Sequence, residues 1–141
     1  KLISVFGGKL TTARALATEA LDALGVGGFK FTATSTLPGG DVSAAFNASL
    51  AGLAGWMPES LVHRLARAYG TRLERMLDGA RSLADLGRHF GAGLHEREVR
   101  YLIEVEFAQT AEDVLWRRTK LGLAMTGEEQ AALAAWIATA K

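Results

Sequence analysis

A short run of glycines, a lysine and two threonines is the first stretch of this sequence that is suited to chemistry. It reads Gly7-Gly8-Lys9-Leu10-Thr11-Thr12 and lies between an apolar run, Leu2 to Phe6, and a helical pattern. Where a strand passes through a glycine turn into a helix, the free backbone N–H groups and the helix dipole favour a negatively charged ligand. The run is therefore a candidate site for an anion or a cofactor, and the alternative is an ordinary tight turn with a solvated lysine.

A nucleotide-binding P-loop uses the same physical principle, but its spacing does not fit here. That motif needs a serine or threonine directly after its lysine, and an earlier glycine five residues before the Gly-Lys pair. Leu10 follows Lys9 instead. The sequence thus excludes a Walker A loop.

The histidines and the densest basic stretch are weaker candidates. His63, His89 and His95 do not have metal-ligand spacing, such as two histidines four apart with a glutamate between them. We therefore expect no metal site. The basic stretch is interrupted by Glu74 and Asp78, as in many solvated helix faces, although a phosphate, lipid or partner site is the alternative. Its members are Arg64, Arg67, Arg72, Arg75 and Arg81.

One pair of opposite charges falls on apolar helical stripes. Glu106 shares the stripe of Val99, Leu102 and Ile103, and Arg118 aligns in the same way with its apolar neighbours. A charge buried alone is very costly, so we expect Glu106 and Arg118 to pair across two helices, within about 6 Å. A role for Glu106 as a general base is the less favoured alternative, because no histidine or nucleophile stands near it in sequence.

Composition limits what these residues can be part of. The chain has 141 residues, of which 49% are hydrophobic and 22% charged, and this suits an ordinary domain with a real core. A net charge of +1 gives no attraction to polyanions, so we expect no nucleic acid as a partner. There is no cysteine, hence no disulfide or thiolate site, which suits a cytoplasmic protein. Without an apolar run near the roughly 18 residues that span a bilayer, we expect a soluble chain.

Two regions must position the candidate residues. Residues 1–30 predict a strand, the glycine turn and a helix from Ala13 to Leu24 with one buried face, ended by a left-handed cap at Gly25. A lone strand leaves its ladder groups unpaired, and the sequence has no initial methionine. We therefore expect a piece of a longer polypeptide, in which these residues complete an α/β sheet.

Residues 31–141 predict a mainly α-helical domain. After the loop Leu37-Pro38-Gly39-Gly40 we expect about five helices packed in a bundle-like manner. The expected segments are Pro58 to Tyr69, a short helix capped by Thr71, a tight turn from Ser82 to Gly87, a helix from Glu96 to Phe107, and helices that begin at Thr110 and Thr126.

Two blocks of this chain match a known family pattern. They are Ser4-Val5-Phe6 with the glycine run, and Glu112-Asp113-Val114-Leu115-Trp116-Arg117-Arg118-Thr119-Lys120-Leu121-Gly122. Both resemble the FAD-dependent (aerobic) glycerol-3-phosphate dehydrogenases. The loop at 37–40 and Ala68-Tyr69-Gly70 agree with that family in order and spacing, so the similarity covers most of the chain.

The resemblance implies a role for each residue of the glycine run. Gly7 and Gly8 would let the backbone approach the isoalloxazine ring of FAD, and the amides at Leu10, Thr11 and Thr12 would meet its N1 and C2 edge. Lys9 would contact the phosphate of glycerol 3-phosphate. No catalytic residue is assigned within this chain. The family commonly has tyrosine where Ala13 stands, so no role of that ring is carried over.

The resemblance also implies the domain plan and the reaction. Residues 1–30 would be the last strand and helix of the FAD-binding domain, and residues 31–141 a helical C-terminal cap domain. The parent flavoprotein would oxidise sn-glycerol 3-phosphate to dihydroxyacetone phosphate with FAD and a quinone, as a peripheral protein on the inner face of the cytoplasmic membrane. Without the missing N-terminal FAD and substrate domains, this chain alone should be inactive and should bind little FAD.

Two alternatives stay open at this point. One is a glycerol-3-phosphate oxidase that passes electrons to oxygen. The other is a helical module that docks on protein partners or on the membrane through its arginines and exposed aromatic residues.

Overall fold

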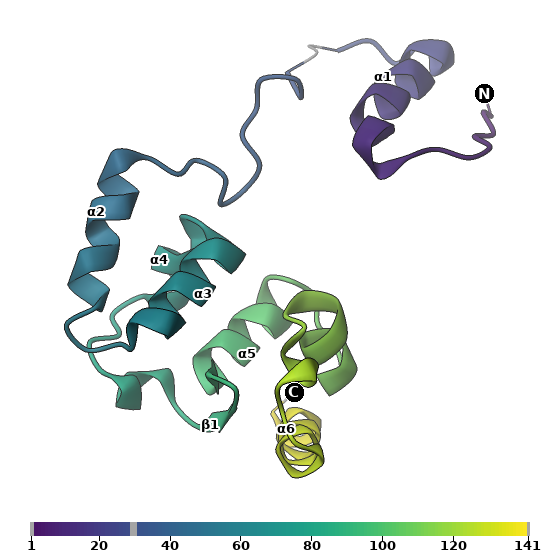
Figure 1. Cartoon of the computed structure of the whole chain (residues 1–141). Coiled ribbons are helices and arrows are strands. Elements are labelled where there is room, and N and C mark those ends of the chain that lie inside the picture. Colours follow the sequence, from purple (N-terminus) through teal and green to yellow (C-terminus); the bar gives the residue numbers. More distant parts are fainter. Residues whose placement is uncertain (1, 29–30, 141) are drawn as a thin grey trace. The chain divides into compact units, whose positions relative to one another are not determined.

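The computed structural model describes residues 2–28 and 31–140, which divide into two compact units (Figure 1). The first unit is Lys1–Leu37 and the second is Pro38–Lys141. The boundary expected after residue 30 falls on residues 29 and 30, outside the described residues, so it stays a prediction.

The first unit contains a short 3-10 helix, η1 (Leu10–Thr12), that leads directly into α1 (Ala13–Leu24). As predicted, α1 ends where Gly25 adopts the left-handed conformation, with φ 72°. The strand predicted at Leu2 to Phe6 is wrong, because the described residues of this unit contain no strand. A strand exists only with a hydrogen-bonded neighbour, and no other segment described here supplies one.

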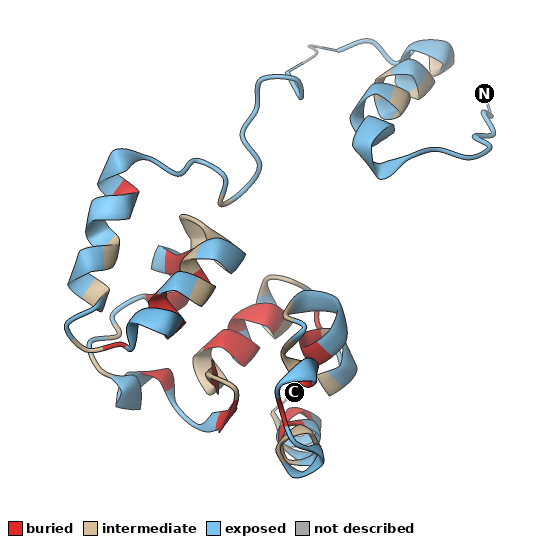
Figure 2. Ribbon diagram, in the orientation of Figure 1, coloured by how far each residue is buried: buried red, intermediate tan, exposed pale blue. Residues whose placement is uncertain are grey.

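The apolar face of α1 is also not buried. None of the residues of this helix is buried, as its blue and tan ribbon in Figure 2 shows. Phe6 and Leu10 beside it are 93% and 94% exposed. The prediction of a buried face is therefore wrong within this chain, since the unit lacks a surface of its own to cover that face.

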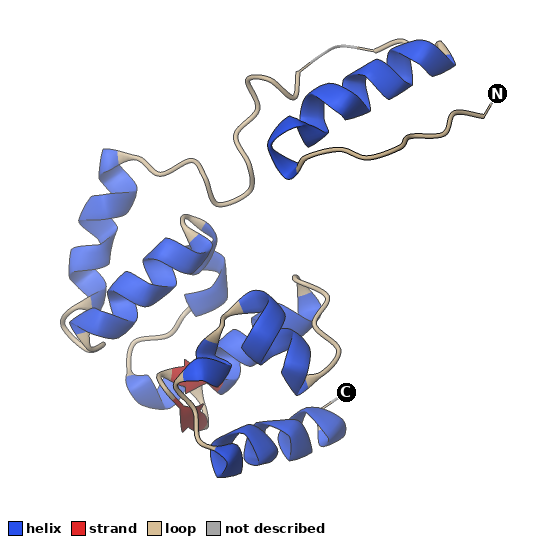
Figure 3. Ribbon diagram, turned by 45° about the vertical axis from the view of Figure 1, so that its right-hand side comes forward, coloured by secondary structure: helices blue, strands red, loops and turns tan. Residues whose placement is uncertain are grey.

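The second unit is mainly helical, as predicted, with one small hairpin (Figure 3). In chain order its elements are α2 (Ala44–Leu53), α3 (Glu59–Tyr69), α4 (Arg72–Leu77), the 3-10 helix η2 (Leu83–Leu86), β1 (His89–Gly91), β2 (Leu94–His95), α5 (Glu96–Glu104), the π-helix η3 (Asp113–Arg118), the 3-10 helix η4 (Leu121–Leu123) and α6 (Gly127–Thr139). No helix in the described parts is long and apolar enough to cross a membrane.

Side-chain caps start several of these helices. Thr126 and Glu129 form the predicted capping box of α6, and Ser82 forms one with Asp85 at η2. The cap predicted at Thr71 is wrong. Its hydroxyl donates to the carboxylate of Asp41 instead, and so fastens the loop before α2 to the start of α4.

The core consists of two apolar clusters that meet at α5. Tyr101 belongs to a cluster built mainly from α2, α3 and α4, whereas Val99 and Leu102 belong to a cluster with η3 and α6. Leu94, Val99, Val114 and Leu133 are completely buried in the second cluster. The red segment of α5 in Figure 2 lies where the two clusters meet, so the orientation of α5 determines how they pack against each other.

The hairpin was missed by the sequence analysis. β1 and β2 are antiparallel, and Gly91 is paired with Leu94 across the two-residue turn Ala92-Gly93. Both turn residues have positive φ, 47° and 74°, as a type I′ turn requires. The Gly-x-Gly sequence between two histidines was the available signal, although strands this short carry almost no alternating pattern.

Candidate functional site

The glycine run has the backbone geometry that a close approach to a ligand requires. Gly7 and Gly8 have φ of 79° and 134°, values that L side chains rarely adopt. Lys9 is extended, and its carbonyl accepts hydrogen bonds from the Thr12 amide at 3.0 Å and the Thr12 hydroxyl at 3.2 Å. Thr12 therefore carries the first amide of this helix that donates to a helix carbonyl, and the N–H groups of Leu10 and Thr11 before it are available to an anion.

A hollow of about 290 Å³ adjoins this turn. Its lining includes Phe6, Gly7, Gly8, Thr12 and Leu16. Three of the predicted site residues thus come together in one concave surface. Lys9, Leu10 and Thr11 do not line it; they are exposed beside it. The roles of all six residues toward FAD and substrate stay predictions.

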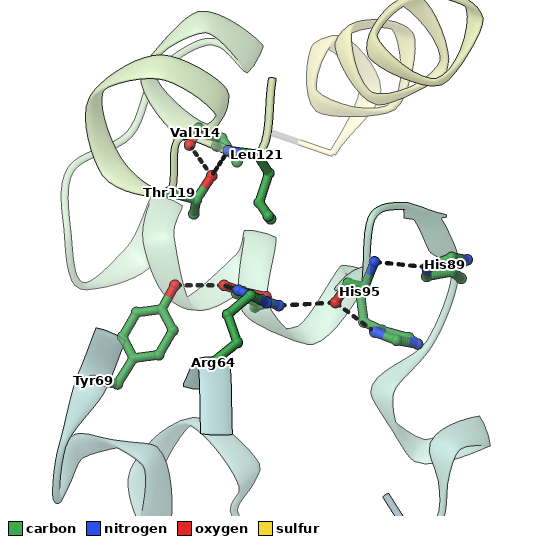
Figure 4. Close-up of polar contacts among 9 residues, drawn as sticks. Arg64, Tyr69, His89, His95, Val114, Thr119 and Leu121 are labelled. Atoms are coloured by element: carbon green, nitrogen blue, oxygen red, sulfur yellow. Dashed lines mark hydrogen bonds and ion pairs between the residues drawn. The ribbon is translucent and has the colours of Figure 1, made fainter. Parts of the chain in front are cut away.

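The second unit contains a buried ionic cluster that the sequence analysis missed (Figure 4). Glu98 is only 3% exposed, and its two carboxylate oxygens accept from Arg64 Nη1 at 2.8 Å and Nη2 at 2.7 Å. Tyr69 donates its hydroxyl to the same carboxylate at 2.7 Å. Arg64 Nη2 also donates to the carbonyl of Gly93 at 2.9 Å, so this cluster joins α3, the hairpin turn and α5.

The electrostatics of this cluster indicate a fixed charge pair, not a proton shuttle. Burial acts to lower the pKa of Arg64, but the hydrogen bonds and the charge of Glu98 offset it, and the pKa is raised overall. Burial, then the charge and hydrogen bond of Glu98, raise the pKa of Tyr69 well above its ordinary value. At neutral pH Arg64 is charged and Tyr69 keeps its proton. The cluster therefore holds α3, the hairpin turn and α5 together.

A usable sequence signal existed for Glu98. It stands three and four residues before Tyr101 and Leu102, on the same helical face, which is the criterion that selected Glu106. Arg64 was interpreted as part of a solvated basic face, and that interpretation is wrong, since its side chain is 25% exposed and paired.

The predicted pairing of Glu106 with Arg118 is confirmed, but its burial is not. Arg118 Nη1 lies 3.6 Å from Glu106 Oε2, and the two side chains are 40% and 33% exposed. The physical reason is that α5 ends at Glu104, so Glu106 leaves the buried stripe. An exposed pair of this kind contributes little to stability.

The histidines of the hairpin face each other. His89 and His95 are cross-strand partners with ring centroids 4.8 Å apart. The Gly93 amide donates to His89 Nε2 at 3.2 Å, and His95 Nδ1 lies 3.2 Å from the Gly93 carbonyl. Burial lowers the pKa of His95. Within the described residues no group of three or more metal-ligating side chains comes together.

The block at 112–122 folds into the π-helix η3 and the segment that directly follows it. Asp113 accepts from the amides of Gln109 and Thr110, each at 2.9 Å, and these bonds with the Thr110 hydroxyl lower its pKa to about 2. After the π-helix, the Thr119 hydroxyl donates to the Val114 carbonyl at 2.7 Å and accepts from the Leu121 amide at 3.2 Å (Figure 4). The Thr119 side chain therefore bonds both to the π-helix, at Val114, and to the segment that follows it, at Leu121.

Comparison with known proteins places the fold in a family. The family model described as the C-terminal domain of alpha-glycerophosphate oxidase matches residues 30–141. The chain belongs to that family. The resemblance to the C-terminal part of FAD-dependent glycerol-3-phosphate dehydrogenases, which the two blocks indicated, is thereby confirmed.

Individual relatives agree with the family match. The chain is 48% identical to a glycerol-3-phosphate dehydrogenase of Pseudomonas aeruginosa and 40% identical to the aerobic glycerol-3-phosphate dehydrogenase of Escherichia coli. It is 45% identical to D-erythritol 1-phosphate dehydrogenase of Brucella abortus. Each comparison covers 96% of this chain but only 28% of the relative, so the chain spans little more than a quarter of those proteins.

Proposed function

We propose that this chain is the C-terminal domain of a flavoprotein that oxidises sn-glycerol 3-phosphate to dihydroxyacetone phosphate, with FAD as hydride acceptor and a quinone as electron acceptor. The family match over residues 30–141 carries the proposal. The glycine turn before that region supports it independently, because its exposed helical amides suit an anionic cofactor edge or substrate phosphate.

The residues present fit the edge of a flavin. Gly7 and Gly8 have no side chain and hold positive φ, so their backbone can approach a planar ring closely. The amides at Leu10, Thr11 and Thr12 begin a helix whose dipole favours the negative charge of a reduced flavin at N1 and the C2 carbonyl. FAD supplies the hydride acceptor when bound, and these residues orient it and adjust its electron affinity.

Lys9 is the proposed contact for the substrate phosphate. Its side chain is exposed beside the hollow, on extended backbone directly before η1. An ammonium on a flexible stem acts as a point charge for a phosphate, and the helix amides next to it add to the attraction. The base that takes the hydroxyl proton, and the glycine loop that holds the adenosine half of FAD, would belong to the rest of the polypeptide. We therefore propose that this chain alone has no turnover.

The test uses the longer flavoprotein that carries this domain, under anaerobic conditions. Glycerol 3-phosphate should bleach its visible flavin band. Lys9→Ala should raise the substrate concentration for half-bleaching by roughly 10- to 100-fold, since a charged hydrogen bond is lost, and Lys9→Arg should restore part of the affinity. Absence of a flavin band, or no bleaching by this substrate, refutes the enzyme proposal. Unchanged half-bleaching in Lys9→Ala refutes the phosphate contact alone.

The matching family and one of the relatives favour two related alternatives. The matching family is named for alpha-glycerophosphate oxidase, which supports oxygen as the acceptor, and one relative is a D-erythritol 1-phosphate dehydrogenase. Oxygen uptake with hydrogen peroxide release identifies the oxidase, whereas reduction of a soluble quinone without oxygen uptake identifies the dehydrogenase. Bleaching by D-erythritol 1-phosphate at lower concentration than by glycerol 3-phosphate would identify D-erythritol 1-phosphate as the preferred substrate.

The proposed location is the cytoplasm, with the flavoprotein bound peripherally to the inner face of the membrane where its quinone resides. Cosedimentation of the flavoprotein with anionic liposomes, reversed by salt, would support this location. Failure to bind liposomes of any composition would contradict it.

A further inference from the structure

We propose that Phe107, Trp116 and Leu123 form the face through which this domain packs on the flavin-binding part of the same polypeptide. We call these three residues the Phe107 face. The proposal rests on the proposed function, because it needs a longer flavoprotein, and it goes further by naming the surface of the helical domain that meets the rest of that protein.

Phe107 occupies a backbone position that normally suits glycine. It follows the end of α5 with φ 61°, and the next amide, that of Ala108, donates back to the Leu102 carbonyl at 2.9 Å. Phe107 lies shortly beyond the cap of α5 at Val105, and a left-handed residue after a helix end is usually glycine or asparagine. A bulky side chain there carries a conformational cost.

The domain gains little from this side chain in return. Phe107 is 79% exposed, although its neighbour Ala108 is 1% exposed and part of the core. An aromatic residue in a costly conformation with so little burial has no explanation inside the second unit. Strained positions of this kind are kept where the side chain has a task outside its own element.

Trp116 and Leu123 are the exposed large apolar side chains of the segment that an ion pair joins to the chain beside Phe107. The Trp116 ring lies so close to Gly122 that a Cβ built there would stand 2.6 Å from its atoms, and Leu123 follows directly. Trp116 is 37% exposed and Leu123 is 81% exposed. The ion pair of Arg118 with Glu106 joins this π-helical segment to the residue before Phe107. π-Helical turns occur frequently at functional sites.

The charges around this face favour a protein surface over a lipid surface. Three cations, Arg117, Arg118 and Lys120, accompany three anions, Glu106, Glu112 and Asp113. Arg117 pairs with Asp113 at 2.7 Å and with Glu112 at 3.1 Å, so the cations are largely neutralised. A surface for anionic lipid needs unpaired basic residues, whereas exposed aromatics with balanced charges are typical of protein contacts.

The relatives' length indicates which protein surface this is. The family domain is C-terminal by description, and this chain covers 28% of each relative compared above. A domain held in one polypeptide with a larger part normally shares an interface with it. We therefore assign the Phe107 face to that partner and not to a second copy of the chain.

The decisive experiment compares one substitution in two contexts. In the 141-residue chain, Phe107→Gly should raise Tm by about 2–5 °C, because glycine relieves the left-handed strain and little packing is lost. In the longer flavoprotein the same change should lower the unfolding temperature of this domain by several degrees, since the interface is lost. Leu83→Ala removes a 40% exposed leucine outside the face and should act equally in both contexts.

Hydrogen exchange gives a second readout that needs neither flavin nor activity. Amides from 107 to 123 should exchange at least about tenfold more slowly in the longer flavoprotein than in this chain. Effects of the same sign for Phe107→Gly in both contexts, with equal exchange, overturn the proposal. Protection that rises with concentration of this chain, or only with liposomes, overturns it in favour of a second copy or a membrane. Loss of substrate bleaching with these results intact would refute only the proposed function.

Discussion

Replacing Glu98 by alanine removes the acceptor that Arg64 and Tyr69 share in the interior of the helical domain. Three hydrogen bonds disappear, two from the guanidinium and one from the phenol, at 2.7 to 2.8 Å. Arg64 keeps only its bond to the Gly93 carbonyl and is left with an unpaired charge that is 25% exposed. The variant therefore measures what it costs to leave a buried cation without its counter-ion.

The magnitude follows from the burial of the two partners. Breaking a buried ion pair by removing one member costs about 3–5 kcal/mol, and the partial exposure of Arg64 favours the lower end, about 3 kcal/mol. Glu98→Gln keeps the shape and one acceptor but loses the charge, so we expect about 2 kcal/mol. Replacing both Arg64 and Glu98 with methionine removes both charges, and the pair should cost less than the sum of the single variants.

Urea denaturation followed by tryptophan fluorescence is the suitable assay. All three tryptophans, Trp56, Trp116 and Trp136, lie in the second unit, so the signal reports that unit alone. A loss of about 3 kcal/mol should move the urea midpoint down by about 1–3 M. Glu104→Gln, an exposed acid on the same helix, is the control and should change stability by less than about 0.5 kcal/mol. A cost below about 1 kcal/mol for Glu98→Ala, or strict additivity in the double variant, would refute the reasoning.

Two further predictions concern a helix start and a helix end. Gly70→Ala should lower the free energy of unfolding by at least about 2 kcal/mol, because a Cβ there would stand 1.8 Å from the Gly39 carbonyl oxygen. Gly79 also has positive φ but open space around it, so Gly79→Ala should lower it by only about 1 kcal/mol. Equal urea midpoints for the two variants would contradict this. Asp113→Ala should destabilise the domain at neutral pH by removing the bonds to the amides of Gln109 and Thr110. Because folding lowers the pKa of Asp113 from 3.8 to about 2, the difference from the parent chain should be complete above pH 4 and shrink as pH falls through 2, and a difference that does not change with pH would disprove it.

Local signals predicted several of the helical elements, although they missed α2 and gave a tight turn where η2 forms. The left-handed cap at Gly25 depends on the backbone freedom of one glycine, and the capping box depends on Thr126 and Glu129, which are close in sequence; both are confirmed. The strand at Leu2 to Phe6 failed for the opposite reason, since no segment of the described residues pairs with it. Local sequence therefore specified these two caps, although not the one expected at Thr71, whereas a strand depends on a partner segment that local sequence does not supply.

The residues of the candidate site show the same difference between local features, which were predictable, and long-range contacts, which were not. The glycine run was recognisable because its chemistry is contained in six consecutive residues, and the structure gives Gly7 and Gly8 the positive φ that such a turn needs. Arg64 and Glu98 are 34 residues apart, and the local sequence around each gives no indication that the two side chains pair. The Glu106–Arg118 pairing was predictable because both charges interrupt apolar stripes, but its burial depended on where α5 ends.

α5 links the two inferences about the helical domain. Its first half carries Glu98, whose bonds fix the helix against α3 and the hairpin, and Phe107 follows its end in the left-handed conformation. A short helix held at one end by a buried ion pair has little freedom to rotate, so the position of the residues that directly follow it is set as well. The buried cluster thus has a consequence beyond stability, because it determines where the Phe107 face points in the packing proposed above.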